Sequence, residues 1–121
     1  MRLYHNEQCS KSRAALALLR QAGYEPTVID YIDQPPDTAT LDRLLNLLDG
    51  EPDTLVRRND PGFTDWADID EPPLERNRVI EILTVEPALM QRPILETDEG
   101  AIIARPPERV FELVAEQSDD A

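Results

Sequence analysis

Cysteine and histidine are almost absent from this 121-residue sequence, which contains one of each, Cys9 and His5. A single cysteine excludes an internal disulfide, so redox chemistry at Cys9 needs a thiol from another molecule. A single histidine argues against a histidine-based metal site, and the scattered carboxylates lack the spacing of a calcium loop. We therefore expect neither a metal ion nor a bound cofactor.

Long apolar runs are also absent, although hydrophobic residues make up 40% of the chain. No run approaches the roughly 18 residues that a membrane-spanning helix needs, and the first residues do not resemble a signal peptide. We therefore expect a cytoplasmic protein with no membrane partner. A length of 121 residues is typical of one domain that buries its own core.

Basic residues are outnumbered, with 12 Lys and Arg against 25 Asp and Glu, which gives a net charge of −13. Such a charge repels nucleic-acid phosphates, so we expect no nucleic-acid partner. It also repels small anions, so an anion site here must be built from local positive charge. Lys11 is the only lysine, and the remaining cations are arginines, whose planar guanidinium groups bind oxyanions in a bidentate manner.

The first third of the chain has the pattern of a strand, a helix and a second strand. Residues 2–5 read as a short strand, and from Ser10 to Ala22 the apolar residues recur at three- and four-residue steps, as on one face of a helix. Residues 27–32 are β-branched and aromatic. The spacing predicts a βαβ unit, with parallel strands joined by a right-handed crossover.

The rest of the chain predicts helices first and a hairpin afterwards. The turn signal at 98–100 lies between two apolar runs, as in a β-hairpin, and paired prolines suit the first turn of a helix. The expected elements, in order, are a helix over 37–50, a charged Asp- and Pro-rich stretch over 59–73, a helix ending near Pro87, strands over 93–97 and 101–104, and a helix opened by Pro106 and Pro107.

This order predicts an α/β fold, a thioredoxin/glutaredoxin-like mixed sheet with flanking helices and a helical insertion between its βαβ and ββα halves. We expect residues 1–121 to form a single domain, with residues 36–90 as the helical insertion. Nothing in the sequence demands more than a monomer.

Cys9 lies between the first strand and the first helix, where unpaired N–H groups and the helix dipole favour a thiolate. The alternative is that Cys9 is a small buried hydrophobic residue, but its neighbours Ser10 and Lys11 are poorly suited to core packing. His5 either stabilises this thiolate or donates a proton, or is only a structural hydrogen-bonding group.

Three arginines lie beside apolar segments in an otherwise acidic chain: Arg57, Arg92 and Arg105. Each, taken alone, is interpreted as a solvated surface charge. Periodicity does not show whether they meet in space. Pro93, which follows Arg92 at the start of a strand, indicates an edge or a special turn.

Residues 5–13, HNEQCSKSR, closely resemble the active-site segment of glutaredoxin-coupled arsenate reductases, which reads His-Asn-Pro-x-Cys-Ser-Lys-Ser-Arg. The similarity covers nearly the whole chain. It continues, in chain order, at Leu16-Ala17-Leu18-Leu19, Gly23-Tyr24-Glu25-Pro26, Tyr31-Ile32-Asp33-Gln34-Pro35-Pro36, Leu55-Val56-Arg57, Gln91-Arg92-Pro93-Ile94 and Ala104-Arg105-Pro106-Pro107-Glu108.

The resemblance implies a reductase in which Cys9 attacks arsenate and forms a thiol–arsenate adduct. Glutathione is then the co-substrate, and glutaredoxin is the partner that completes the reduction to arsenite. The other residues of the family's active site also have counterparts in this sequence. They are Arg57, Arg92 and Arg105 as the oxyanion clamp, His5 and Ser12 beside the cysteine, and Pro93 as a cis proline near it.

One position departs from the family pattern, because Glu7 stands where the family usually has proline. A carboxylate directed inward would raise the pKa of Cys9 and oppose an anionic substrate. We therefore expect the Glu7 side chain to face solvent.

Two other functions fit a lone cysteine on this fold. One is a glutathione-binding thiol oxidoreductase without arsenate activity, although members of that kind often lack part of the arginine set. The other is a non-enzymatic, partner-binding regulator with a CxxC redox switch, which Ser12 argues against because it occupies the second cysteine position. The thioredoxin-coupled arsenate reductases are excluded, because they need further cysteines.

Overall fold

The computed structural model describes residues 1–48, 50–63, 66 and 74–115. The described chain forms strands β1 (Arg2–His5), β2 (Thr27–Asp30), β3 (Ile94–Thr97) and β4 (Gly100–Ile103), and α-helices α1 (Ser10–Gln21), α2 (Thr38–Leu47) and α4 (Arg76–Val85). Short 3₁₀ helices complete it: η1 (Pro52–Leu55), η2 (Pro61–Phe63), η3 (Pro87–Leu89) and η4 (Pro107–Glu112).

The strands form one mixed sheet in the order β2-β1-β3-β4. β1 and β2 are parallel and are joined by α1, whereas β3 pairs antiparallel with both β1 and β4. Between β2 and β3 the named elements of the described chain are all helices. The predicted fold class is therefore confirmed, including the parallel pair and the hairpin.

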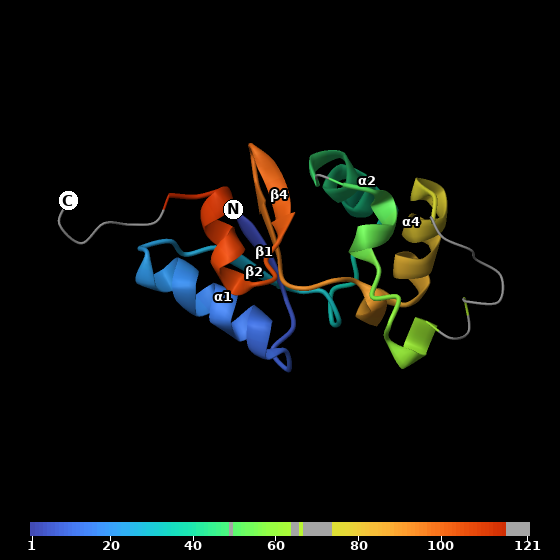
Figure 1. Cartoon of the computed structure of the whole chain (residues 1–121), viewed down its shortest axis with the longest axis horizontal. Coiled ribbons are helices and arrows are strands. Elements are labelled where there is room, and N and C mark those ends of the chain that lie inside the picture. Colours follow the sequence, from blue (N-terminus) through green and yellow to red (C-terminus); the bar gives the residue numbers. More distant parts are fainter. Residues whose placement is uncertain (49, 64–65, 67–73, 116–121) are drawn as a thin grey trace.

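Helices cover both faces of the sheet, as Figure 1 shows, with α1 and η4 on one side and α2 and α4 on the other. Alternate residues of each strand point to opposite faces, so β1, β3 and β4 each contribute to two cores, whereas β2 contributes Ile29 to one of them. Leu3 and Leu95 are paired across β1 and β3 and pack in the core under α1, whereas Tyr4 and Ile94 pack in the larger core under α2 and α4.

Local side chains explain where several elements begin and end. Asp37 caps α2, because its carboxylate accepts a hydrogen bond from the Thr40 N–H at 2.8 Å. After α1 the chain turns at Gly23, whose φ of 92° lies in the left-handed region that glycine adopts without strain.

Two predicted boundaries and one predicted helix type were wrong in detail. β2 ends at Asp30 rather than at Ile32, because the Asp30 carboxylate accepts the N–H of Ile32 at 3.0 Å and turns the chain away from the sheet. α2 ends at Leu47, and its cap Leu48 is already extended and bridges to Ala101 of β4. The segment after Pro106 is a 3₁₀ helix, not an α-helix. Of the predicted 59–73 stretch, residues 64–65 and 67–73 lie outside the described residues.

A buried carboxylate joins α2 to the sheet. Glu96 of β3 is 1% exposed, and it accepts hydrogen bonds from Arg43 Nε of α2 at 2.5 Å and from the Tyr4 hydroxyl of β1 at 2.8 Å. Arg2 approaches the same carboxylate at 3.4 Å. Because both cations hold it, the pKa of Glu96 is lowered although burial alone would raise it.

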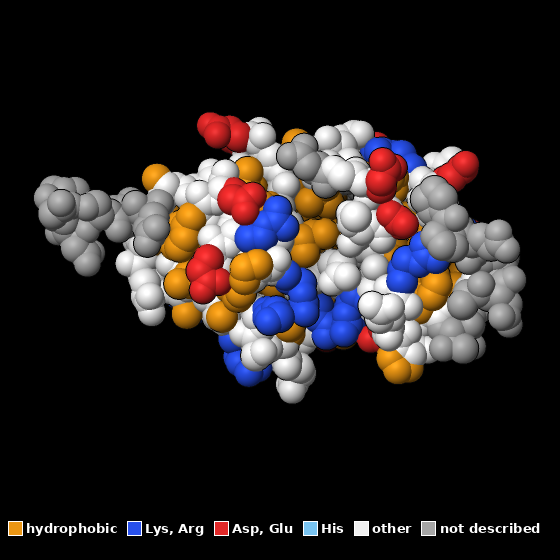
Figure 2. Space-filling model, viewed as in Figure 1, with side chains coloured by type: hydrophobic (Ala, Val, Ile, Leu, Met, Phe, Trp, Pro, Cys, Tyr) orange, Lys and Arg blue, Asp and Glu red, His pale blue; other side chains and the backbone are white. Residues whose placement is uncertain are grey.

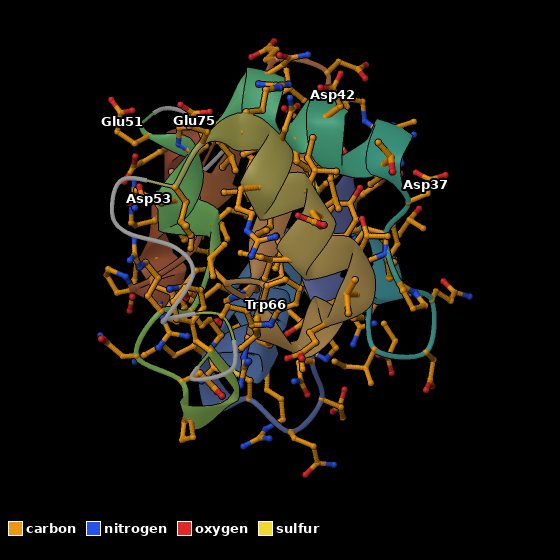
Figure 3. The ribbon with its side chains drawn as sticks, turned by 90° about the vertical axis from the view of Figure 1, so that its right-hand side faces the viewer. Asp37, Asp42, Glu51, Asp53, Trp66 and Glu75 are labelled. Carbon is orange, nitrogen blue, oxygen red and sulfur yellow. The ribbon has the colours of Figure 1, made fainter. Side chains whose placement is uncertain are left out.

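Charges are unevenly distributed over the surface. Figure 2 shows lysine and arginine side chains gathered in the lower middle of one face, where the sheet meets the helical segment. Figure 3 views the end formed by α2 and α4, with Trp66 near its centre and labelled carboxylates around its upper half and sides: Asp37, Asp42, Glu51, Asp53 and Glu75. No helix in the described part of the chain is long and apolar enough to cross a membrane.

Candidate active site

Cys9 is the N-cap residue of α1, and its own loop holds it there. The Cys9 N–H donates to the Asn6 carbonyl at 2.9 Å, and the Gln8 N–H donates to the Asn6 side-chain oxygen at 2.9 Å. The Cys9 carbonyl accepts the first helical hydrogen bond, from the Arg13 N–H at 3.1 Å. The thiol is therefore placed at the positive end of the helix dipole, as the sequence predicted.

Ser12 supports the loop from within α1. It is fully buried, and its hydroxyl accepts a hydrogen bond from the Asn6 N–H at 3.3 Å. Burial by itself disfavours the Cys9 thiolate, but the Ser12 N–H, the Arg92 side chain, the Lys11 N–H and the Ser12 hydroxyl all favour it. Together they lower the pKa of Cys9 to about 7. A substantial fraction of Cys9 is therefore thiolate, the nucleophilic form, at neutral pH.

This ionisation gives a direct test that needs no substrate. The rate of Cys9 alkylation by iodoacetamide is expected to rise with pH through a midpoint near the thiol pKa of about 7. Ser12→Ala removes one stabilising hydroxyl and is expected to move the midpoint to higher pH. Ser10→Ala alters an exposed neighbour and serves as the control. A midpoint near the ordinary thiol value in the wild type would contradict the assignment.

Arg92 and Arg105 lie side by side at the two outer ends of the β3–β4 hairpin. Arg105 Nη1 donates to the Arg92 carbonyl at 3.0 Å, and the Ala104 N–H donates to the Pro93 carbonyl at 2.9 Å. The Arg92–Pro93 peptide bond is cis, and the Arg105–Pro106 bond is also cis. The antiparallel pairing of β1 with β3 brings Arg92 to the edge of the sheet at which Cys9 lies.

Arg57 lies beyond these two arginines, in a neighbouring cavity of about 440 Å³ that Arg58, Gln91 and Arg105 also line. Its backbone N–H donates to the Leu89 carbonyl at 2.7 Å. The cavity residues do not include Cys9 or Arg92. Arg105 therefore connects this cavity with the part of the site that contains Cys9 and Arg92, because Arg105 lines the cavity and contacts Arg92.

The Arg57 guanidinium already has an anionic partner inside the protein. It forms an ion pair with Asp60 at 2.8 Å, and both side chains are largely buried, at 28% and 26% exposed. An anion that binds Arg57 must therefore compete with a carboxylate three residues along the chain.

His5 is held by a hydrogen bond to Glu7. It is 3% exposed, and its Nε2 shares a 2.7 Å hydrogen bond with the carboxylate of Glu7. Its Nδ1 is buried without a hydrogen-bond partner among the described residues. The Glu7 side chain is 69% exposed, so it reaches back to His5 while remaining at the surface. The largest influences on the pKa of Cys9 come from burial, Ser12, Arg92 and Lys11.

Two features of the site were not evident from the sequence. Tyr31 was assigned to a strand, yet it follows β2 and its hydroxyl lies near Arg92 and Arg57. Asp60 lies in the predicted charged stretch, and its i, i+3 spacing from Arg57 is the sequence signal for their ion pair. Within the described residues, no group of three His, Cys, Asp or Glu side chains is placed to hold a metal ion.

The family model of the ArsC family matches residues 4–113, which include Cys9 and all three arginines. The chain belongs to the ArsC family. The resemblance stated from the sequence is thereby confirmed at the level of the family, and the mixed sheet with flanking helices is the thioredoxin-like ArsC fold.

Three relatives match over almost their whole length. The uncharacterized protein YfgD of Escherichia coli strain K12 is 37% identical over 94% of this chain and 96% of its own length. The arsenate reductase of Neisseria meningitidis strain MC58 is 33% identical over 91% of this chain and 94% of its own. The structure of an arsenate reductase from Vibrio cholerae superposes with a TM-score of 0.86 at 32% identity, over 94% and 98% of the two chains.

Proposed function

We propose that this ArsC-family protein is an arsenate reductase that uses glutathione and glutaredoxin. The observation that carries the proposal is the Cys9 thiol, with its pKa lowered to about 7, in contact with Arg92, whose neighbour Arg105 lines a cavity together with Arg57. A reactive thiolate beside guanidinium groups is suited to attack on a small oxyanion. The names of the Neisseria and Vibrio relatives supply the identity of that oxyanion.

In the proposed reaction, the Cys9 sulfur attacks arsenic(V), and one arsenate oxygen leaves as water after it takes up protons. The arginines neutralise the negative charge of the oxygens that remain, which lowers the barrier to attack by an anionic thiolate. Ser12 keeps the sulfur anionic through its hydroxyl and its N–H.

Reduction needs two electrons, and a protein with one cysteine must obtain them from outside. The glutathione thiol replaces a second arsenic oxygen, which leaves as water, and a sulfur–arsenic bond forms. A glutaredoxin thiolate then attacks the glutathione sulfur, so that a mixed disulfide forms and the electrons of the broken bond reduce arsenic(V) to arsenic(III). Hydrolysis of the remaining Cys9–arsenic bond releases arsenite and restores the thiol.

The test is NADPH consumption in a coupled assay with arsenate, glutathione, glutaredoxin and glutathione reductase. The wild type is expected to show turnover that requires arsenate, and Cys9→Ser is expected to lose it to background, because the serine hydroxyl is not ionised at neutral pH. Omission of arsenate and omission of glutaredoxin are the matched controls. A folded wild type whose Cys9 is alkylated readily but which shows no arsenate-dependent turnover would contradict the proposal.

A further inference from the structure

The Tyr31 hydroxyl is an unpaired polar group in the interior, near Arg92 and near Asn6 of the loop that holds Cys9. Tyr31 is fully buried, and its hydroxyl has no hydrogen-bond partner among the described residues. The Asn6 amide and the Arg92 guanidinium lie close enough to interact with it, but neither forms a hydrogen bond of good geometry. A buried hydroxyl without a partner costs stability, and proteins rarely retain one without a use for it.

The surroundings of this hydroxyl belong to the site described above. Asn6 is in the loop that holds Cys9, whereas Arg92 and Arg57 come from segments far along the chain. Burial raises the pKa of Tyr31, and the charges of Arg92 and Arg57 only partly offset this effect. The hydroxyl therefore keeps its proton at neutral pH and is a hydrogen-bond donor.

A second unpaired donor lies in the same place. Arg92 Nε is buried without a hydrogen-bond partner in the described residues, although Arg92 Nη1 reaches the Ala88 carbonyl at 3.4 Å. The Tyr31 hydroxyl and Arg92 Nε are thus two buried donors without an acceptor among the described residues, and the Arg57 guanidinium, which pairs with Asp60, also lies near the hydroxyl. Such a group of donors and positive charge is suited to an anion.

We propose that Tyr31 is a substrate-binding residue whose hydroxyl donates a hydrogen bond to a tetrahedral oxyanion held between Arg57 and Arg92. This inference rests on the proposed function and adds a neutral donor to its arginines. The hydroxyl adds a neutral, directed donor to the charged guanidinium groups, so it helps to orient the oxyanion relative to Cys9. This role explains why the Tyr31 hydroxyl is buried, why it has no hydrogen-bond partner among the described residues and why arginines lie near it.

The probe is inorganic phosphate, a tetrahedral oxyanion with the shape of arsenate that forms no sulfur adduct. Binding is measured as protection of Cys9 from iodoacetamide at increasing phosphate concentration and constant ionic strength. Tyr31→Phe is expected to raise the half-protecting concentration about tenfold, because one hydrogen bond to a charged group is lost. Its melting temperature is expected to stay unchanged or to rise, because the hydroxyl removed has no partner in the free protein.

Tyr24→Phe is the matched control. The Tyr24 hydroxyl donates to the Ala115 carbonyl at 2.8 Å, and Tyr24 packs against the smaller core rather than at the site. This variant is expected to keep the affinity of the wild type for phosphate and to lose a little stability.

The outcomes separate the two proposals. Equal protection in Tyr31→Phe and the wild type would overturn the role of Tyr31 and leave the proposed function standing. A melting temperature that falls more in Tyr31→Phe than in Tyr24→Phe would also overturn it, because the hydroxyl would then be satisfied within the protein. A wild type that phosphate and arsenate both fail to protect would overturn the proposed function and this inference with it.

Discussion

Arg92→Ala is expected to lower arsenate turnover by about 10²–10³-fold, the usual cost of removing one donor that stabilises a developing oxyanion. Arg92 acts twice at the site, because its side chain favours the Cys9 thiolate and its guanidinium faces the place proposed for the oxyanion. The same substitution is therefore expected to raise the pKa of Cys9 above about 7. Both the lost oxyanion contact and the raised thiol pKa are expected to lower turnover at neutral pH.

The measurement combines steady-state turnover with the pH profile of Cys9 alkylation. Arg92→Lys keeps the charge but loses the planar fork, so its thiol pKa is expected to stay near that of the wild type while turnover still falls. Arg20→Ala is the control, because Arg20 is exposed on α1 and pairs with Glu25. An Arg92→Ala variant with the turnover and the alkylation profile of the wild type would remove Arg92 from the site.

Arg43→Ala is expected to lower the free energy of unfolding by about 2–3 kcal/mol at pH 7. Arg43 donates to Glu96 through Nε at 2.5 Å and Nη2 at 3.2 Å, and its loss leaves a buried carboxylate with fewer partners. Breaking a fully buried pair costs more, about 3–5 kcal/mol. The smaller figure applies because Arg43 is 44% exposed and Tyr4 and Arg2 still contact Glu96.

The difference in the free energy of unfolding between the wild type and Arg43→Ala is expected to shrink as the pH falls. The pKa of Glu96 is lower in the folded state than in the unfolded state, so its ion pair contributes fully above the ordinary carboxyl pKa of about 4.3. This contribution disappears as the pH falls through the lower, folded pKa. Urea unfolding of the wild type and Arg43→Ala at a series of pH values measures it, and Arg20→Ala is expected to show a far smaller loss. A gap that stays constant from pH 7 to pH 3 would contradict this account.

The architecture was largely predictable because the spacing of apolar residues along the chain indicates which segments form helices and which form strands. The helical repeat from Ser10 onward and the β-branched run from Thr27 are local signals, and together they imply the parallel pair of β1 and β2. The errors came from single side chains. The Asp30 carboxylate ends β2 two residues early, and no periodicity records that a side chain will turn back to the backbone.

The site was only partly predictable. The place of Cys9 followed from where the strand ends and the helix begins, but the arginines come from three separate segments and periodicity does not join them. Their grouping was expected from the family resemblance alone. Tyr31 was missed, because whether a buried hydroxyl finds a partner depends on packing among Asn6, Arg57 and Arg92, which no local pattern encodes.

The antiparallel pairing of β1 with β3 has a consequence for the newly made protein. Cys9 leaves the ribosome before Arg92 and before β3, the strand that follows Arg92 and pairs with β1. Until β3 docks beside β1, the cysteine lacks the guanidinium that helps to ionise it. During synthesis the Cys9 thiol is therefore less ionised and reacts more slowly with oxidants and electrophiles. It reaches its full reactivity only when the sheet is complete.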